Sequence, residues 1–177
     1  AVFSAAVSAG QKRAILLCSK AIRNERENRR CIPVVREIEA NELEGLLTLY
    51  TQLHDNPFPA DTEQLRNLWQ HILEDPDHHV IVAVEDGRIA SSCVCVIIPN
   101  LTHGQRPYAL IENVITDEAW RGRGLAGACL GYARNIAKKA GCYKMMLLTG
   151  SKEESTHRFY QRAGYNANDK TAYIQWL

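Results

Sequence analysis

A short segment in the second half of the chain combines glycine and arginine in the manner of an anion-binding loop. It reads Arg121-Gly-Arg-Gly124-Leu-Ala-Gly127, and it joins an apolar run, residues 109–116, to a segment of helical periodicity, residues 125–140. The start of a helix leaves backbone N–H groups without partners and carries the positive end of the helix dipole, so phosphates bind there readily. Glycine lets the backbone approach a bulky diphosphate, while the arginines add charge and forked donors. The sequence therefore predicts a diphosphate-binding loop at the start of a helix.

Two common nucleotide-binding motifs do not explain this loop. The spacing Gly122-x-Gly124-x-x-Gly127 fits the dinucleotide fingerprint, but that motif requires an acidic residue about 20 residues later. The corresponding stretch, Met145-Met-Leu-Leu-Thr149, contains no acid. A mononucleotide P-loop is excluded as well, because no Lys followed by Ser or Thr comes after the glycines.

Glu112 is the residue of the apolar run that could move a proton. It is the only acid between Ala109 and Thr116. Low polarity around a carboxylate raises its pKa toward the range of a general base. A carboxylate at the sheet surface, or one paired with an arginine, is the alternative interpretation. We therefore treat Glu112 as a candidate base whose burial the structure can check.

Composition and charge indicate an ordinary globular domain without a bulk attraction for nucleic acid or membranes. The 177 residues are 46% hydrophobic and 23% charged, and the formal net charge is +1. The six cysteines show no metal-like spacing, so we expect buried, reduced thiols in a cytosolic protein. His78 and His79 would point to opposite faces of a strand, and we predict no metal site.

Residues 1–30 differ in character from the rest of the chain. They are rich in small apolar residues, and the first acid is Glu25. We predict an N-terminal extension over residues 1–30, in helical form, and one folded domain over residues 31–177. An organellar presequence is the alternative, because such segments are rich in Ser and Arg and poor in acids. The apolar stretches of this extension are too short and interrupted to span a membrane.

The expected elements from residue 32 onward follow the order β-α-α-β-β-β-α-β-α-β. Asp86-Gly87 predicts a tight type I′ turn between two strands, and Ser151-Lys-Glu-Glu154 fits a helix capping box. The second half of the domain should contain a strand at 108–116, a helix at 125–140, a parallel strand at 143–148, a helix at 152–163 and a closing strand at 172–177. The fold class is α/β (α+β), with a central mixed, mostly antiparallel sheet flanked by helices.

Two motifs resemble those of the GNAT N-acetyltransferases. Arg121-x-x-Gly124-x-Ala126 resembles that family's acyl-CoA loop, R/Q-x-x-G-x-G/A, and Phe159-Tyr-Gln-Arg-Ala-Gly-Tyr165 resembles its F-Y-x-x-x-G-F/Y block. Within the family, Ile111-Glu-Asn-Val114 and Gly141-Cys-Tyr-Lys144 are most similar to glucosamine-6-phosphate N-acetyltransferases. The resemblance implies the acyl-CoA N-acyltransferase fold, acetyl-CoA as cosubstrate, and direct attack by the primary amine of a small molecule, with an amino sugar phosphate as a candidate. Together with the apolar residues of 172–177, it implies a homodimer.

The resemblance also implies roles for individual residues. Glu112 is the expected base, directly or through a water, and the backbone N–H of Val114 is the expected donor to the acetyl carbonyl. Tyr160 is the expected acid that protonates the departing thiolate, although a tyrosine at its helical position could instead be a core residue. Asn113 departs from the acid that this branch of the family carries there. The implied acyl-CoA contacts are Asn113, Val114, Ile115, Thr116, Arg121, Gly122, Arg123, Gly124, Leu125, Ala126, Gly127, Ser155, Arg158 and Tyr160.

Two other functions stay open at this point. A protein or peptide acetyltransferase of the same fold would have an open groove beside residues 54–60 and 99–107. A non-catalytic acyl-CoA-binding module is the second alternative, and the presence of both Glu112 and Tyr160 speaks against it.

Overall fold

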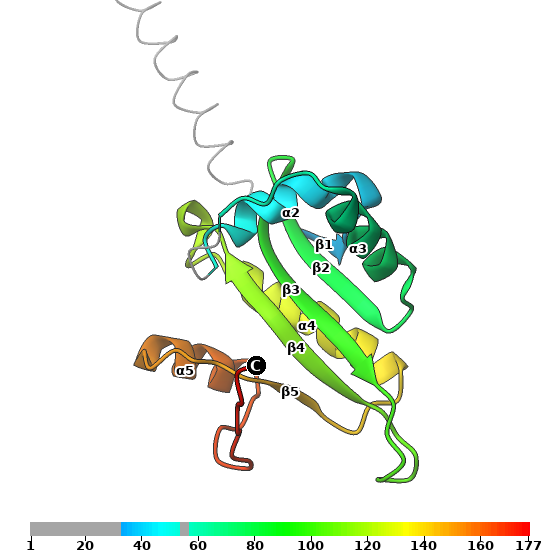
Figure 1. The fold of residues 1–177 in the computed structure, drawn as a ribbon. Helices are drawn as coiled ribbons and strands as arrows, with labels where there is room; N and C mark the ends of the chain where they lie inside the picture. The colour runs from blue at the N-terminus through cyan, green and yellow to red at the C-terminus, as the bar shows by residue number, and fades with distance from the viewer. Residues whose placement is uncertain (1–32, 54–56) are drawn as a thin grey trace, which may run out of the picture. The chain divides into compact units, whose positions relative to one another are not determined.

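A five-stranded sheet organises the part of the chain that the computed structural model describes, residues 33–53 and 57–177 (Figure 1). The strand order is β1-β2-β3-β4-β5, with antiparallel pairs from β1 to β4 and a parallel pair between β4 and β5. This confirms the mixed, mostly antiparallel sheet. The predicted N-terminal extension, residues 1–30, lies outside the described residues. The strands are β1 (Val34–Glu37), β2 (His78–Glu85), β3 (Arg88–Ile98), β4 (Tyr108–Thr116) and β5 (Met145–Leu147).

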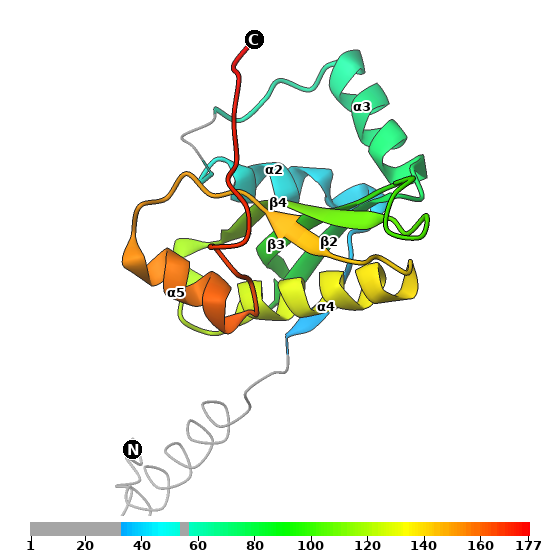
Figure 2. The same ribbon diagram turned by 90° about the horizontal axis from the view of Figure 1, so that it is seen from below.

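Helices cover both faces of the sheet. Two helices, α2 and α3, lie on one face, while α4 lies on the other face and α5 lies on that same side, next to the β5 edge (Figure 2). The helices are α2 (Leu43–Tyr50), α3 (Glu63–Glu74), α4 (Leu125–Lys139) and α5 (Glu154–Arg162), with single 3-10 turns η1 (Ala40–Glu42) and η2 (Glu118–Trp120). Because α4 connects β4 to β5 as a crossover, these two strands run parallel, as predicted.

Each face of the sheet has its own hydrophobic core. The α4-side core joins residues of β2, β3 and β4 to α4, and its members include Ile81, Cys93, Cys95, Ile111, Leu125, Cys129 and Ala133. The α2-side core consists of Leu46, Trp69, Val80, Val82 and Val94. Indole Nε1 of Trp69 donates to the Ala40 carbonyl oxygen at 2.9 Å, which ties α3 to η1. The two cores fix α2 and α4 on opposite sides of β2 and β3.

The described cysteines behave as small hydrophobic residues. Cys93, Cys95 and Cys129 are fully buried, and all four described cysteines are free thiols. Burial raises the pKa of Cys95 to about 12, so this thiol stays protonated at neutral pH. The prediction of buried thiols is confirmed for these residues, whereas the cytosolic location stays a prediction.

The β2–β3 hairpin forms as predicted. Asp86 and Gly87 have φ of 48° and 74°, which is the left-handed pair that a type I′ turn requires. Gly141, at φ 75°, follows Ala140, the C-cap of α4, and ends the helix. Among the described residues, no helix is long and apolar enough to cross a bilayer.

The predicted closing strand at residues 172–177 is wrong. The described sheet ends at β5, and the C-terminal segment is a coil that passes the sheet edge and projects on the side of α2 (Figure 2). Its large side chains are exposed, with Tyr173 at 92% and Trp176 at 88%. A strand requires a backbone partner, and an apolar sequence pattern does not specify which backbone that partner belongs to. The apolar pattern of residues 172–177 therefore predicted a strand but could not show whether a neighbouring strand is available to pair with it.

Candidate active site

The strand β4 has one residue more than β3 at the centre of the sheet. Ser92 pairs with Ile115 and Val94 with Glu112, so Cys93 alone lies opposite Asn113 and Val114. This two-against-one arrangement is a β-bulge.

Asn113 is the residue at which the bulge turns the backbone. It has φ 50°, in the left-handed region that asparagine tolerates better than most residues. One extra residue reverses the alternation of side chains, and as a result Ile111 and Val114 both pack in the α4-side core. The bulge thus redirects the second half of β4.

The strands β4 and β5 separate at the same place. Residues 109–111 of β4 pair with residues 145–147 of β5, but β4 continues to Thr116. Its edge over residues 112–116 therefore has no strand partner among the described residues. An unpaired strand edge presents N–H and C=O groups that can bind an extended ligand. The predicted acyl-CoA contacts at residues 113–116 lie along this edge.

The glycine and arginine loop follows β4 and η2 directly. Gly122 and Gly124 have φ of 77° and 83°, and Gly124 is the N-cap of α4. A Cβ at either position would meet no heavy atom within 4 Å. Glycine is therefore required by the backbone conformation, and the space in front of the loop is open. The first turn of α4 carries no acidic side chain, so its positive end is free for an anion.

The two arginines flank the loop in different ways. Arg121 donates from Nε to the Thr116 carbonyl oxygen at 3.3 Å, and its Nη1 lies 3.4 Å from the Glu118 carboxylate. The guanidinium of Arg123 lies 4.4 Å from the centre of the Trp120 ring, a cation–π contact. Such exposed contacts are weak, so both side chains can turn to a phosphate at small cost.

Glu112 is exposed, which contradicts the low-polarity environment predicted for it. The apolar neighbours in the sequence do not surround this carboxylate, because Ile111 and Val114 pack in the α4-side core. Figure 1 shows α2 and α3 together on one face of the sheet. The carboxylate is accessible to a ligand on this face.

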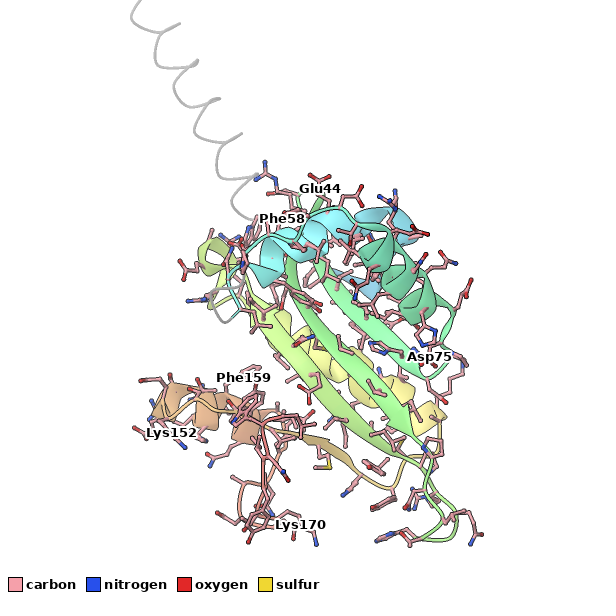
Figure 3. All side chains as sticks on the ribbon, viewed as in Figure 1. Glu44, Phe58, Asp75, Lys152, Phe159 and Lys170 are labelled. Atoms are coloured by element: carbon pink, nitrogen blue, oxygen red, sulfur yellow. The ribbon has the colours of Figure 1, made fainter. Side chains whose placement is uncertain are left out.

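Tyr160 is half-buried on α5. Its ring contacts Phe159, with centroids 5.0 Å apart, and meets the Tyr165 ring edge-on at 6.0 Å. All three rings pack against the α4-side core, and Figure 3 shows Phe159 at the end of α5 nearest the sheet. Burial is the main cause that raises the pKa of Tyr160, so the phenol holds its proton. Tyr160 can therefore pack in the core with its ring and still donate a proton with its hydroxyl.

The predicted contacts on α5 are less well supported. Ser155 and Arg158 are exposed, and Arg158 pairs with Glu154 on its own helix. The predicted capping box does not form, since the N-cap is Glu153 and makes no side-chain cap bond. The Ser151 hydroxyl instead accepts from the Glu153 N–H at 3.2 Å, which starts the helix later than the sequence suggested. No described contact joins Ser155 or Arg158 to the loop.

A groove between α4, β5 and α5 was missed by the sequence analysis. It has a volume of about 300 Å³ and begins at Gly127, the last residue of the loop; it is lined by Gly127, Leu130, Gly131, Arg134, Met145, Phe159, Arg162 and Ala163. Neither Arg134 nor Arg162 makes an ion pair with a described residue. Helical spacing could have placed Gly127, Gly131 and Arg134 on one face, but only the packing of α5 brings Arg162 to it.

Metal ligation finds no support in residues 33–53 and 57–177, where no group of three His, Cys, Asp or Glu residues could hold an ion. Glu37, on β1, lies 3.1 Å from the His79 ring nitrogen instead.

Known proteins share this architecture and these motifs. The model of the family described as acetyltransferase (GNAT) matches residues 43–165. The chain is 34% identical over 84 residues to a glucosamine 6-phosphate N-acetyltransferase of Trypanosoma brucei brucei, and this match covers 48% of the chain and 55% of that protein. It is 29% identical over 126 residues to a glucosamine 6-phosphate N-acetyltransferase of Arabidopsis thaliana, covering 70% of the chain and 78% of that protein. The crystal structure of a Trypanosoma brucei acetyltransferase is similar with a TM-score of 0.70 and 27% identity, covering 81% of this chain and 99% of that one.

We predict that Arg121→Ala weakens CoA binding by about 1–3 kcal/mol, because phosphate contacts are lost. Isothermal titration calorimetry measures this change. Arg66→Ala is the matched control, because Arg66 is an exposed arginine on α3 that pairs with Asp61, and it should leave CoA affinity unchanged. Tight binding of NAD by the wild type, with none of CoA, would contradict the assignment of the loop.

Proposed function

Because the chain belongs to the acetyltransferase (GNAT) family, we propose that it transfers the acetyl group of acetyl-CoA to the primary amine of a small molecule, and that this molecule is an amino sugar phosphate. Family membership rests on the match over residues 43–165. The observation that carries the proposal is the bulged, unpaired edge of β4, which leads directly into the loop at the start of α4. This arrangement suits a ligand with an extended arm and a diphosphate.

Three binding tasks fall to different parts of the site. The N–H groups at the start of α4 and Arg121 hold the diphosphate, while the edge of β4 binds the thioester arm by backbone hydrogen bonds. The Val114 N–H donates to the acetyl carbonyl, where negative charge develops during attack. A backbone donor needs no particular side chain, so this task depends on the shape of β4.

The reaction moves one acetyl group and two protons. The amine nitrogen attacks the carbonyl carbon, a C–N bond forms, and the C–S bond breaks to release the CoA thiolate. Glu112 accepts the first proton of the ammonium, directly or through a water, which leaves the neutral amine that attacks. The acylated nitrogen then loses a second proton to solvent, and Tyr160 regains from solvent the proton that it gives away. Tyr160 gives its proton to the thiolate, which is a role for a phenol that is protonated at neutral pH.

The choice of acceptor draws on two relatives named glucosamine 6-phosphate N-acetyltransferase. Asn113 stands where the resemblance to that branch implies an acid, so a contact made by that acid would be lost here. The acceptor is tested with a panel of glucosamine 6-phosphate, glucosamine and a lysine-containing peptide, with release of free thiol from acetyl-CoA as the signal. We expect the highest kcat/KM for the phosphorylated sugar. Preferential turnover of the peptide would overturn the choice of acceptor while leaving acetyl transfer intact.

We predict different pH profiles for variants of the two proton-transfer residues. Glu112→Gln should lower turnover most near neutral pH and recover in part as the pH approaches about 10, where the free amine needs no base. Tyr160→Phe should lower turnover with little change in CoA affinity, and less so with a thioester donor whose thiol is more acidic.

The raised pKa of Tyr160 sets the alkaline limit of the wild type. Because the phenol keeps its proton beyond its ordinary value of about 10, any decline caused by its ionisation should begin above pH 10. Profiles of rate against pH for wild type and both variants, with two donors, provide the measurement. Equal and pH-independent losses in both variants would mean that both residues are structural.

We also propose a homodimer with residues 172–177 near its interface. Exposed large apolar side chains in this segment support it, because such surface is normally covered. Light scattering at micromolar concentration should give the mass of a dimer, and Trp176→Glu should shift it toward the monomer. Leu101→Glu is the control, since Leu101 and Trp176 are both 88% exposed. A monomeric wild type would exclude the dimer.

A further inference from the structure

The groove between α4, β5 and α5 collects positive charge that no described residue neutralises. Arg134 belongs to α4 and Arg162 is the last residue of α5, and both line the groove. Neither guanidinium makes a hydrogen bond or an ion pair with a described residue. No acidic side chain is among the described residues that line the groove. An anion that enters it would therefore meet two free, forked donors and no competing carboxylate.

Two glycines form part of the wall that α4 gives to the groove. Gly127 and Gly131 lie one turn apart, and Arg134 follows them on the same face of the helix. Glycine inside a helix destabilises it relative to alanine. A Cβ at either position would meet no heavy atom within 4 Å, so packing within the described chain does not require glycine there. The effect of the two glycines is to leave this surface of α4 open to a ligand.

The groove continues directly from the diphosphate-binding loop. Gly127 belongs to both, because it ends the loop and lines the groove. Arg134 follows Gly127 by seven residues, which is about 10 Å along the helix axis. Helical side chains lean toward the N-terminus, so the guanidinium lies closer to the loop than its own Cα does. CoA carries a third phosphate, a monoester on the ribose beside the diphosphate, and this group is the nearest anion that the loop leaves without a partner.

The phosphate of an amino sugar acceptor does not suit this place. Ile111 packs in the α4-side core, so the side chain of Glu112, the next residue of β4, points to the other face of the sheet. In the proposed reaction the amine approaches Glu112 from that face, whereas α4 and α5 lie on the opposite side (Figure 2). The groove therefore lies on the side of the cosubstrate.

Helix α5 is held to the rest of the domain by apolar packing. Phe159, Tyr160 and Ala163 pack against the α4-side core. Among the described residues, no hydrogen bond or ion pair joins residues 154–162 to α4 or to the sheet. An anion that binds Arg134 and Arg162 together would add a polar link between α4 and α5.

We propose that the groove binds the 3′-phosphate of CoA between Arg134 and Arg162, and that this phosphate links α5 to α4 when the cosubstrate binds. The inference rests on the proposed function, because it takes acetyl-CoA as the cosubstrate. A phosphate monoester carries up to two negative charges at neutral pH and offers three acceptor oxygens, which is enough for both guanidinium groups. Dephospho-CoA lacks only this group and keeps the diphosphate and the thiol arm, so it is the matched ligand for a test.

Isothermal titration calorimetry with CoA and dephospho-CoA tests the site. The wild type should bind CoA about 10- to 100-fold more tightly, the factor that charge-assisted hydrogen bonds support. Arg134→Gln and Arg162→Gln should each weaken binding of CoA and leave binding of dephospho-CoA unchanged. Arg134→Lys should keep part of the preference, because lysine retains the charge but not the forked donors.

A control variant separates the site from bulk charge. Lys139→Gln removes an exposed cation of α4 that does not line the groove, and it should leave both affinities unchanged. Equal affinities of the wild type for CoA and dephospho-CoA would overturn the proposed site. Arginine variants that weaken both ligands alike would overturn it too, since that is the result of a general structural defect.

Hydrogen exchange of the α5 amides tests the link between the helices. CoA should slow exchange over residues 154–162 of the wild type, and dephospho-CoA should slow it much less. In Arg162→Gln the two ligands should have the same effect on these amides. Equal protection of α5 by both ligands in the wild type would overturn the link.

These measurements need no acetyl transfer, so failure of this inference is distinguishable from failure of the proposed function. A preference for CoA that depends on both arginines would support the inference even if no amine in the panel is acetylated. Turnover of glucosamine 6-phosphate with equal affinity for CoA and dephospho-CoA would overturn the inference and leave the proposed function in place. A raised KM for glucosamine 6-phosphate in Arg134→Gln, with the preference for CoA unchanged, would also overturn it, because the groove would then hold the phosphate of the acceptor.

Discussion

An antiparallel strand can accommodate one extra residue only by leaving part of its backbone unpaired, and the site of this protein depends on that constraint. The extra residue in β4 lies at Asn113, two residues after Ile111, where β4 makes its last pair with β5. Pairing on the β5 side stops there, while pairing with β3 resumes at Ile115. The result is a strand that is anchored on one side and free on the other. A free edge within a fixed sheet can bind a ligand without moving, which is the property a preorganised donor needs.

The loop that follows solves an electrostatic problem of its own. Asp117 and Glu118 precede it, and their negative charges would repel a phosphate at the start of α4. Both are occupied: Asp117 accepts bonds from Gln52 and the Ala119 N–H, while Glu118 lies beside Arg121. A phosphate bound there would compete with Glu118 for Arg121, whereas the first turn of α4 carries no acidic side chain. The helix start would then attract the phosphate more strongly than the arginine does.

The sequence predicted those parts of the structure that local chemistry decides. Asp86-Gly87 predicted the turn between β2 and β3, and Gly122 and Gly124 predicted the start of α4. Each of these positions has a positive φ, a backbone conformation that few other residues adopt. The sequence did not predict the bulge, because the apolar pattern of β4 continues on both sides of Asn113 and an asparagine there does not by itself indicate an extra residue. Glu112 was expected to be buried because its neighbours in sequence are apolar, yet burial depends on which helices cover the face, and that is tertiary information. The groove beside Arg134 and Arg162 was missed for the same reason.

The exposure of Glu112 has a consequence for how an amine could be activated. An alkylammonium has a pKa near 10, so a carboxylate in open water takes its proton with difficulty. Glu112 pairs with Val94 through the backbone, and its side chain is exposed, so a bound acceptor could supply the low-polarity surroundings that the protein does not. A bulky, polar acceptor that excludes water from the carboxylate on binding would provide them, whereas a small amine such as ammonia would not. Binding of such an acceptor would then both select it over smaller amines and let Glu112 remove the proton from its nitrogen.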